Sequence, residues 1–210
     1  MDLIYFKKKL WLLEILEEKE ELMSQQSEKK GQPEYLDGMN NPFVQKLKEK
    51  FKENIINAKT YGNELTIWIS KDILIPLCKD LWEEGFIYLV DIMGIHQPKE
   101  EKNFALSYIL HNFKNNERVR LKVEIKEGEL VPSLTEIWKG ANWLEREAFD
   151  MFGILFSNHP NLERILMWEG FEGHPLRKDF PLKGINTGAS IYPDVYPEGG
   201  GPPKKEDKNA

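Results

Sequence analysis

The chain has 210 residues, with 29 Lys and Arg against 35 Asp and Glu, and its formal net charge of −6 at pH 7 argues against nucleic-acid binding, which needs clustered basic side chains. A hydrophobic fraction of 40% and a charged fraction of 30% are typical of a soluble globular domain with a real core. The single cysteine, Cys78, excludes an internal disulfide and an iron–sulfur cluster held by cysteines of this chain alone. No stretch reaches the ~18–20 consecutive apolar residues of a membrane span, so we expect membrane contact only through partners.

Residues 1–30 are predicted to form an amphipathic helix, because apolar residues recur there at helical spacing and are followed by mixed Lys and Glu. Such a helix docks on a partner or lies on a membrane surface, and the alternative is a solvated tail. Residues 31–40, which contain proline, glycine and paired asparagines, are expected to form a linker. The segment 1–40 is therefore interpreted as an N-terminal helix and linker.

The folded core is expected over residues 41–153, and it is predicted to begin with a helix. Asn41 is suited to cap that helix, and Pro42 is suited to its first position, where a missing N–H costs nothing. Apolar residues then stand four apart on one predicted face, namely Phe43, Leu47, Phe51 and Ile55.

A strand and a second helix are predicted next. Residues 64–70 alternate apolar and polar side chains and are rich in β-branched residues, which indicates a strand. Residues 71–84 are predicted to be helical and to end before Gly85. Pro76 leaves the start of this helix open, because the residue before a proline avoids helical geometry.

Three further strands complete the predicted sheet. The apolar run at residues 86–95 favours a central strand buried on both faces. Residues 104–113 and 118–126 are expected to form an antiparallel hairpin, the second strand alternating throughout. The order of elements predicts an α+β fold, with a mixed or antiparallel sheet packed by helices.

The last helix is predicted over residues 133–152. Ser133 and Glu136 match a capping box at its start, and Gly153 is expected to end it. Beyond that point the composition shifts to proline, glycine and charge. We therefore expect residues 154–210 to form an extended segment that wraps partners and ends in a flexible tail.

Glu145 falls inside the apolar stripe of this predicted helix, where a carboxylate is costly unless it is paired and hydrogen-bonded. One hypothesis gives it Arg164 or Arg177 as a partner, which would tie the downstream segment to the helix. The alternative is that Gly140 breaks the helix, shifts its phase and leaves Glu145 in solvent.

Glu147 and Asp150 could in principle share a proton as paired catalytic carboxylates do. Arg146, four residues before Asp150, favours two ionised groups instead. A charged surface that meets a partner is the preferred interpretation, and a hydrolase is the alternative.

His159 and His174 each precede a proline and lie fifteen positions apart. Metal ligands usually occur at short spacing with carboxylate or thiolate companions, which these two lack. Structural hydrogen bonding is therefore the preferred interpretation.

Short motifs follow one another between residues 145 and 181: ERE, DMFG, HP, RIL and PLRKDFP. In this order and spacing they resemble the signature of the 30-kDa subunit family of respiratory complex I, the proton-pumping NADH:quinone oxidoreductase. The resemblance extends over about residues 42–183. The signature residues singled out here are Glu145, Arg146, Glu147, Asp150, His159, Arg164, Pro175, Arg177, Lys178 and Asp179.

The resemblance implies a non-redox structural subunit of the peripheral arm of the complex, next to the 49-kDa-type subunit that helps to form the quinone site. It implies no catalytic, cofactor-binding or metal-binding residue in this chain, with FMN, iron–sulfur clusters and quinone held by other subunits. It also implies a hetero-oligomer on the cytoplasmic side of the cell (inner) membrane, attached peripherally. The alternative is an equivalent subunit of a membrane-bound energy-converting hydrogenase or formate hydrogenlyase.

Overall fold

The computed structural model describes residues 35–168 and 171–181. The helix expected over residues 1–30 lies outside the described residues, as does the end of the C-terminal segment. In chain order the elements are β1 (Leu36–Asp37), α2 (Pro42–Phe51), β2 (Ile55–Tyr61), β3 (Glu64–Ile69), α3 (Leu74–Glu83), β4 (Tyr88–His96), β5 (Phe104–Asn112), β6 (Glu117–Ile125), β7 (Leu130–Pro132), α4 (Ala141–Phe152) and β8 (Leu155–Ser157). Among the described residues, no helix combines the length and apolar character needed to cross a membrane.

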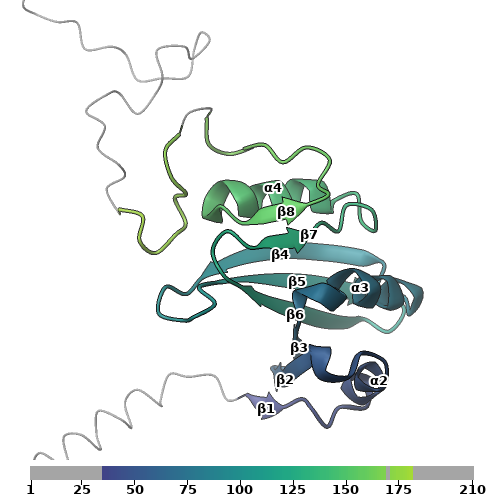
Figure 1. Ribbon diagram of the computed structural model, residues 1–210. Coiled ribbons are helices and arrows are strands. Elements are labelled where there is room, and N and C mark those ends of the chain that lie inside the picture. Colours follow the sequence, from purple (N-terminus) through teal and green to yellow (C-terminus); the bar gives the residue numbers. More distant parts are fainter. Residues whose placement is uncertain (1–34, 169–170, 182–210) are drawn as a thin grey trace, which may run out of the picture.

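Six strands form one mixed sheet in the order β1-β2-β3-β6-β5-β4. Neighbours in this sheet run antiparallel except β3 and β6, which are parallel. The short strands β7 and β8 pair in parallel as a second sheet. Helix α3 lies across the large sheet, whereas α4 and the small sheet lie beside β4 (Figure 1). The predicted α+β fold, with a mixed sheet packed by helices, is confirmed.

The predicted start of α2 is confirmed in atomic detail. The Asn41 side chain accepts a hydrogen bond from the Phe43 N–H at 2.9 Å, and Pro42 occupies the first turn. The helix ends at Phe51, however, and Ile55 begins strand β2, which was not predicted. A spacing of four residues does not distinguish the next turn of a helix from the first inward residue of a following strand.

The second predicted helix divides into a single turn at Lys71–Ile73 and α3 from Leu74. Pro76 then lies in the first turn of α3, where its missing N–H has no intrahelical acceptor to lose. Gly85 follows the helix at a φ of +105°, a conformation that favours glycine, so the predicted end is correct to within one residue.

Strands β5 and β6 form the predicted antiparallel hairpin and supply much of the core. Tyr108 faces Leu121 across the pair, and both side chains are fully buried. The alternation of apolar and polar residues along β6 predicts four inward-facing side chains, and these four are buried: Val119, Leu121, Val123 and Ile125. They share one hydrophobic core with residues of α2 and α3, and their burial stabilises the fold by roughly 25 cal/mol per Å² of apolar surface.

Strand β4 lies at the edge of the sheet, so its predicted central position is wrong. Its apolar content has another cause, because α4 packs against it. The helix approaches the strand closely at Gly94, where an added Cβ would lie 2.4 Å from an atom of the Phe152 ring. The strand's outer edge is therefore covered by a helix rather than by another strand, which also protects it from pairing with other chains.

A Gly94→Ala substitution is expected to lower the free energy of unfolding by about 1–3 kcal/mol, because the methyl group would displace the Phe152 ring from a packed interface. Chemical denaturation measures the change. Gly140→Ala is the matched control, since Gly140 has an ordinary φ of −63° and open space around its Cα. Equal stability of the two variants would show that the contact between β4 and α4 is loose.

The large sheet begins before Asn41. Strand β1 pairs with β2 through Leu36 opposite Thr60, and the Gly38 N–H donates to the Ala58 carbonyl at 3.0 Å. Part of the stretch expected as a linker therefore belongs to the sheet. At the other end, β8 continues the structured core past Gly153.

Candidate functional site: the junction of helix α4 and the arm

Helix α4 begins at Ala141, eight residues later than predicted. Gly140 directly precedes it, and residues 133–140 form turns rather than a helix that this glycine interrupts. Ser133 does not cap a helix: its hydroxyl accepts a hydrogen bond from the Thr135 N–H at 3.2 Å, within a series of turns. Such local side-chain bonds compete with helix formation, which explains why the capping-box pattern failed. The predicted end is correct, because Gly153 adopts a φ of +75° directly after the helix.

Glu145 is fully buried, so the alternative that placed it in solvent is wrong. The predicted arginine partners are also wrong. Its Oε1 accepts the Leu134 N–H at 2.7 Å, and it therefore holds the turns before α4. Burial raises the pKa of this carboxyl to about 7, against the opposing effect of hydrogen bonds from Ser133 and Leu134.

His159 lies beside Glu145, with Nε2 3.9 Å from the carboxylate Oε2, and both side chains are inaccessible to solvent. Its Nδ1 accepts the Asn161 N–H at 3.1 Å, so the ring proton resides on Nε2 and is donated to the Asn142 carbonyl at 3.2 Å. This bonding fixes the tautomer and ties the turn after β8 to the first turn of α4.

The residues that follow β8 cross over α4 without regular structure, and we call residues 158–168 and 171–181 the arm. Asp150, fully buried on α4, is the main attachment point. Its Oδ2 accepts three successive backbone N–H groups, from Ile165, Leu166 and Met167, at 3.0, 2.7 and 2.9 Å. Its Oδ1 accepts Arg164 Nη1 at 3.0 Å. Four donors therefore surround one carboxylate, three of them backbone N–H groups and one a guanidinium.

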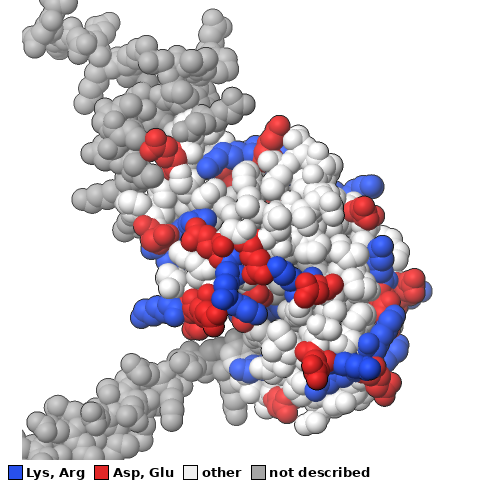
Figure 2. Space-filling view, viewed as in Figure 1, with Lys and Arg blue, Asp and Glu red and all other residues white. Residues whose placement is uncertain are grey.

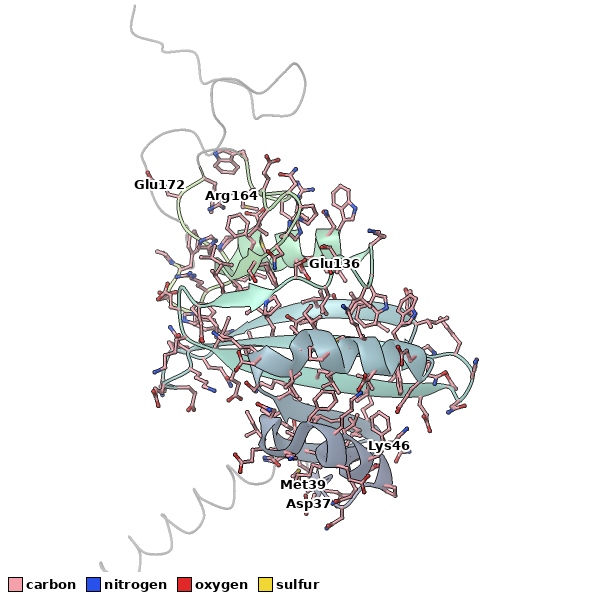
Figure 3. All side chains as sticks on the ribbon, turned by 45° about the vertical axis from the view of Figure 1, so that its right-hand side comes forward. Asp37, Met39, Lys46, Glu136, Arg164 and Glu172 are labelled. Carbon is pink, nitrogen blue, oxygen red and sulfur yellow. The ribbon has the colours of Figure 1, made fainter. Side chains whose placement is uncertain are left out.

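Two arginines extend this attachment. Arg164 also donates to the Gly173 carbonyl at 3.0 Å and so closes the arm on itself. Figure 3 shows Arg164 and Glu172, both on the arm, close together at the α4 end of the molecule. Arg146 on α4 donates from Nε to the Glu163 carbonyl at 3.0 Å, and its guanidinium lies 5.1 Å from the centre of the Trp143 ring.

The C-terminal end of α4 holds a second point of the arm. His174 Nδ1 donates to the Asp150 carbonyl at 2.9 Å, and Arg177 Nε donates to the Phe152 carbonyl at 2.6 Å. Both carbonyls belong to the last turn, where they lack helical partners and where positive charge is favoured. Desolvation lowers the pKa of His174. A Cβ on Gly153 would lie 2.5 Å from His174, so only glycine permits this approach.

The remaining signature residues lie farther along the arm. The Lys178 N–H donates to His96 Nδ1 at 2.9 Å, which leaves no proton on that nitrogen for Asp179, 3.7 Å away. The Lys178 side chain is exposed, as is that of Asp179, and Pro175 is half-buried between His174 and Leu176.

Two residues that receive the arm were not predicted. Glu127 pairs with Arg177 at 2.5 Å, and His96 accepts from Lys178. They lie 50 and 82 residues before their partners, and neither belongs to a recognisable motif. Structural hydrogen bonding by His159 and His174 is confirmed.

The structure does not bring the two candidate catalytic carboxylates into a shared proton site. Asp150 is buried, and both of its oxygens accept hydrogen bonds from the arm. Glu147 is exposed on the outer side of α4 and forms no ion pair within residues 35–168 and 171–181. Arg146 donates to backbone carbonyls rather than to either carboxylate. The cluster therefore attaches a segment of backbone, which is an architectural task.

The fold and this junction together define a class: a small α+β domain whose signature charges fix a non-repetitive arm on its last helix. The family described as "Respiratory-chain NADH dehydrogenase, 30 Kd subunit" matches residues 67–186. An NADH-quinone oxidoreductase subunit of this type from Geotalea uraniireducens (strain Rf4) is 41% identical over 147 residues, which cover 69% of this chain and 90% of that protein. The chain belongs to this family, the 30-kDa subunits of respiratory-chain NADH dehydrogenase.

Two solved structures share the fold. The trypsin-resistant fragment (1-134) of Nqo5 is 27% identical, with a TM-score of 0.51, over 57% of this chain and 98% of the fragment. A chain of the membrane-bound sulfane sulfur reductase, an archaeal respiratory membrane complex, is 23% identical, with a TM-score of 0.58, over 67% of this chain and 84% of that chain. The second likeness shows the fold alone.

Proposed function

We propose that this chain is a non-redox structural subunit of the peripheral arm of proton-pumping NADH:quinone oxidoreductase. It supports the subunits that form the quinone site while electrons pass from NADH to quinone, and its main neighbour is the 49-kDa-type subunit. It works in a hetero-oligomer, on the cytoplasmic side of the cell membrane, attached through the complex. It binds no cofactor; FMN, the iron–sulfur clusters and quinone belong to other subunits.

The observation that carries this proposal is the use of the signature charges. Asp150, Arg146 and Arg164 all bind the backbone of the arm, and Glu145 binds the turns before α4. Asp150 is fully buried and both of its oxygens accept hydrogen bonds from the arm, so neither oxygen is open to take a proton from a substrate. The signature therefore supports shape and attachment rather than chemistry.

Cys78 supports the same interpretation. Its side chain is fully buried in α3, and burial raises the pKa of its thiol far above the ordinary value. The thiolate is the form that binds metals and attacks disulfides, so a buried thiol held in the protonated state is inert. The chain's one cysteine is thus a core residue.

The proposal is tested by purifying the full-length tagged chain from membranes and identifying what accompanies it by mass spectrometry. We expect the subunits of an NADH:quinone oxidoreductase, with NADH:quinone activity in the assembly and none in the isolated chain. Recovery of a nickel-binding large subunit would instead favour the membrane-bound hydrogenase or formate hydrogenlyase. Flavin absorbance or turnover in the isolated chain would contradict the non-redox role.

A further inference from the structure

Four side chains at the α4–arm junction face outward, away from the bonds that hold the arm. Trp143 and Glu147 lie four residues apart on one side of α4, and Glu163 and Leu166 lie on the part of the arm that crosses it. The arm joins the two pairs, because Arg146 and Asp150 of α4 bind residues 163–167. We call these four residues the α4 outer face.

Two large apolar side chains of this face are exposed to water. The Trp143 side chain is 63% exposed and that of Leu166 is 55% exposed. An exposed tryptophan is a candidate contact residue, because tryptophan is among the residues most enriched in the energetic centre of interfaces. In Figure 2, the surface over α4 and the arm is largely uncharged, with isolated acidic and basic side chains.

The face is also held in place before any partner binds. Arg146 lies over the Trp143 ring and donates to the Glu163 carbonyl, and the Leu166 N–H is bonded to Asp150. A surface whose side chains are already ordered loses less conformational entropy on binding. The Trp143 ring and the backbone at Glu163 and Leu166 are therefore held in place in the unbound chain.

The polar part of the face is acidic. Glu147 and Glu163 are exposed, and neither forms an ion pair within the described part of the chain; the Glu163 carboxylate accepts only the Asn161 amide, at 3.2 Å. Arg146, which precedes Glu147 in the chain, is engaged with backbone carbonyls. Two carboxylates beside a tryptophan and a leucine fit a partner surface that presents lysine or arginine around an apolar centre.

Resting on the proposed function, we infer that the α4 outer face is a contact with a neighbouring subunit of the complex, and that the neighbour presents a basic, apolar protein surface there. An anionic membrane leaflet would repel Glu147 and Glu163. A second copy of this chain related by a two-fold axis would place like carboxylates against one another. Both occupants are therefore disfavoured by charge.

The test combines Trp143→Ala with Glu147→Lys in the full chain, expressed with the other subunits. The amount of those subunits that co-purifies is expected to fall at least about tenfold, since loss of a central tryptophan and reversal of a charge both act on the contact. The matched control is Tyr61→Ala with Glu53→Lys, an exposed aromatic and an exposed carboxylate near the opposite edge of the sheet. The control is expected to recover the complex at the wild-type level.

Two further measurements keep the outcome interpretable. Thermal unfolding of the isolated variant is expected to match the wild type, and Glu147→Lys alone, which alters one exposed side chain, is expected to reduce recovery several-fold. Raising the salt concentration is expected to weaken recovery of the wild type more than that of Glu147→Gln, because the partner is basic.

Wild-type recovery by the double variant overturns this inference while leaving the proposed function in place. A wild-type chain that recovers no other subunit overturns the proposed function itself. Self-association of the wild type that the double variant abolishes identifies a second copy as the occupant and also overturns the inference. Binding of the wild type to phosphatidylglycerol vesicles that is lost in the double variant would identify a membrane as the occupant and would also overturn the inference.

Discussion

An Asp150→Ala variant is expected to lose about 3–5 kcal/mol of its free energy of unfolding, which is typical when one partner of a buried charged network is removed. The substitution leaves Arg164 and three backbone N–H groups, those of residues 165–167, without their acceptor. Because these donors are the main attachment of the arm, we also expect the arm to separate from α4.

Urea denaturation measures the loss of stability, and limited trypsin digestion measures the release of the arm. Cleavage after Arg164 is expected to become much faster in the variant, since that residue is bonded to Asp150 and to the Gly173 carbonyl in the wild type. Glu147→Ala, one turn away and exposed, is the control and is expected to change stability by less than about 0.5 kcal/mol. Wild-type cleavage and stability in Asp150→Ala would show that the arm is held elsewhere.

The stability of the wild type relative to a Glu145→Gln variant is expected to fall as the pH rises from about 4.5 to about 7. The folded-state pKa of Glu145 is above its ordinary value of 4.5, so within this window the folded chain keeps a proton that the unfolded chain has lost. The stabilisation is fully present below the lower value and is lost once the pH passes the upper one. A shift of this size corresponds to roughly 3 kcal/mol.

The measurement is the difference in the free energy of unfolding between wild type and Glu145→Gln at several pH values. Glutamine retains an oxygen for the Leu134 N–H but cannot titrate, so every other group cancels in the difference. A difference that does not change across the window would show that Glu145 is ionised in the fold at every pH tested.

Local patterns in the sequence were sufficient for much of the fold. The alternation along β6, the Asn41 cap and the glycines at 85 and 153 each depend on residues close in the chain, and each is found as predicted. Strand β2 was missed because Ile55 continues the helical spacing of α2. The edge position of β4 was not predicted, because an apolar run indicates that a strand is buried but not whether a neighbouring strand or a helix covers it.

The site shows the same division. The signature residues do gather around α4 and the arm, yet the partner of Glu145 was predicted incorrectly. A carboxylate in an apolar stripe indicates that Glu145 needs a hydrogen-bond donor, and a charged side chain was the donor predicted. The donor in the structure is instead the backbone N–H of Leu134. The role of Asp150 as the acceptor that binds the arm was not predicted for a related reason. Three of its four donors are backbone N–H groups, which are present in every sequence and leave no pattern.

The parallel pairing of β3 with β6 has a consequence during synthesis. Strand β3 can pair with β6 only after Val119, the partner of Leu65 and 54 residues later in the chain, has been synthesised. At roughly 5–20 residues per second, the ribosome needs several seconds to deliver that partner. During this interval one edge of the apolar strand β3 is unpaired in the nascent chain. We therefore expect the nascent chain, rather than the folded protein, to depend on chaperones.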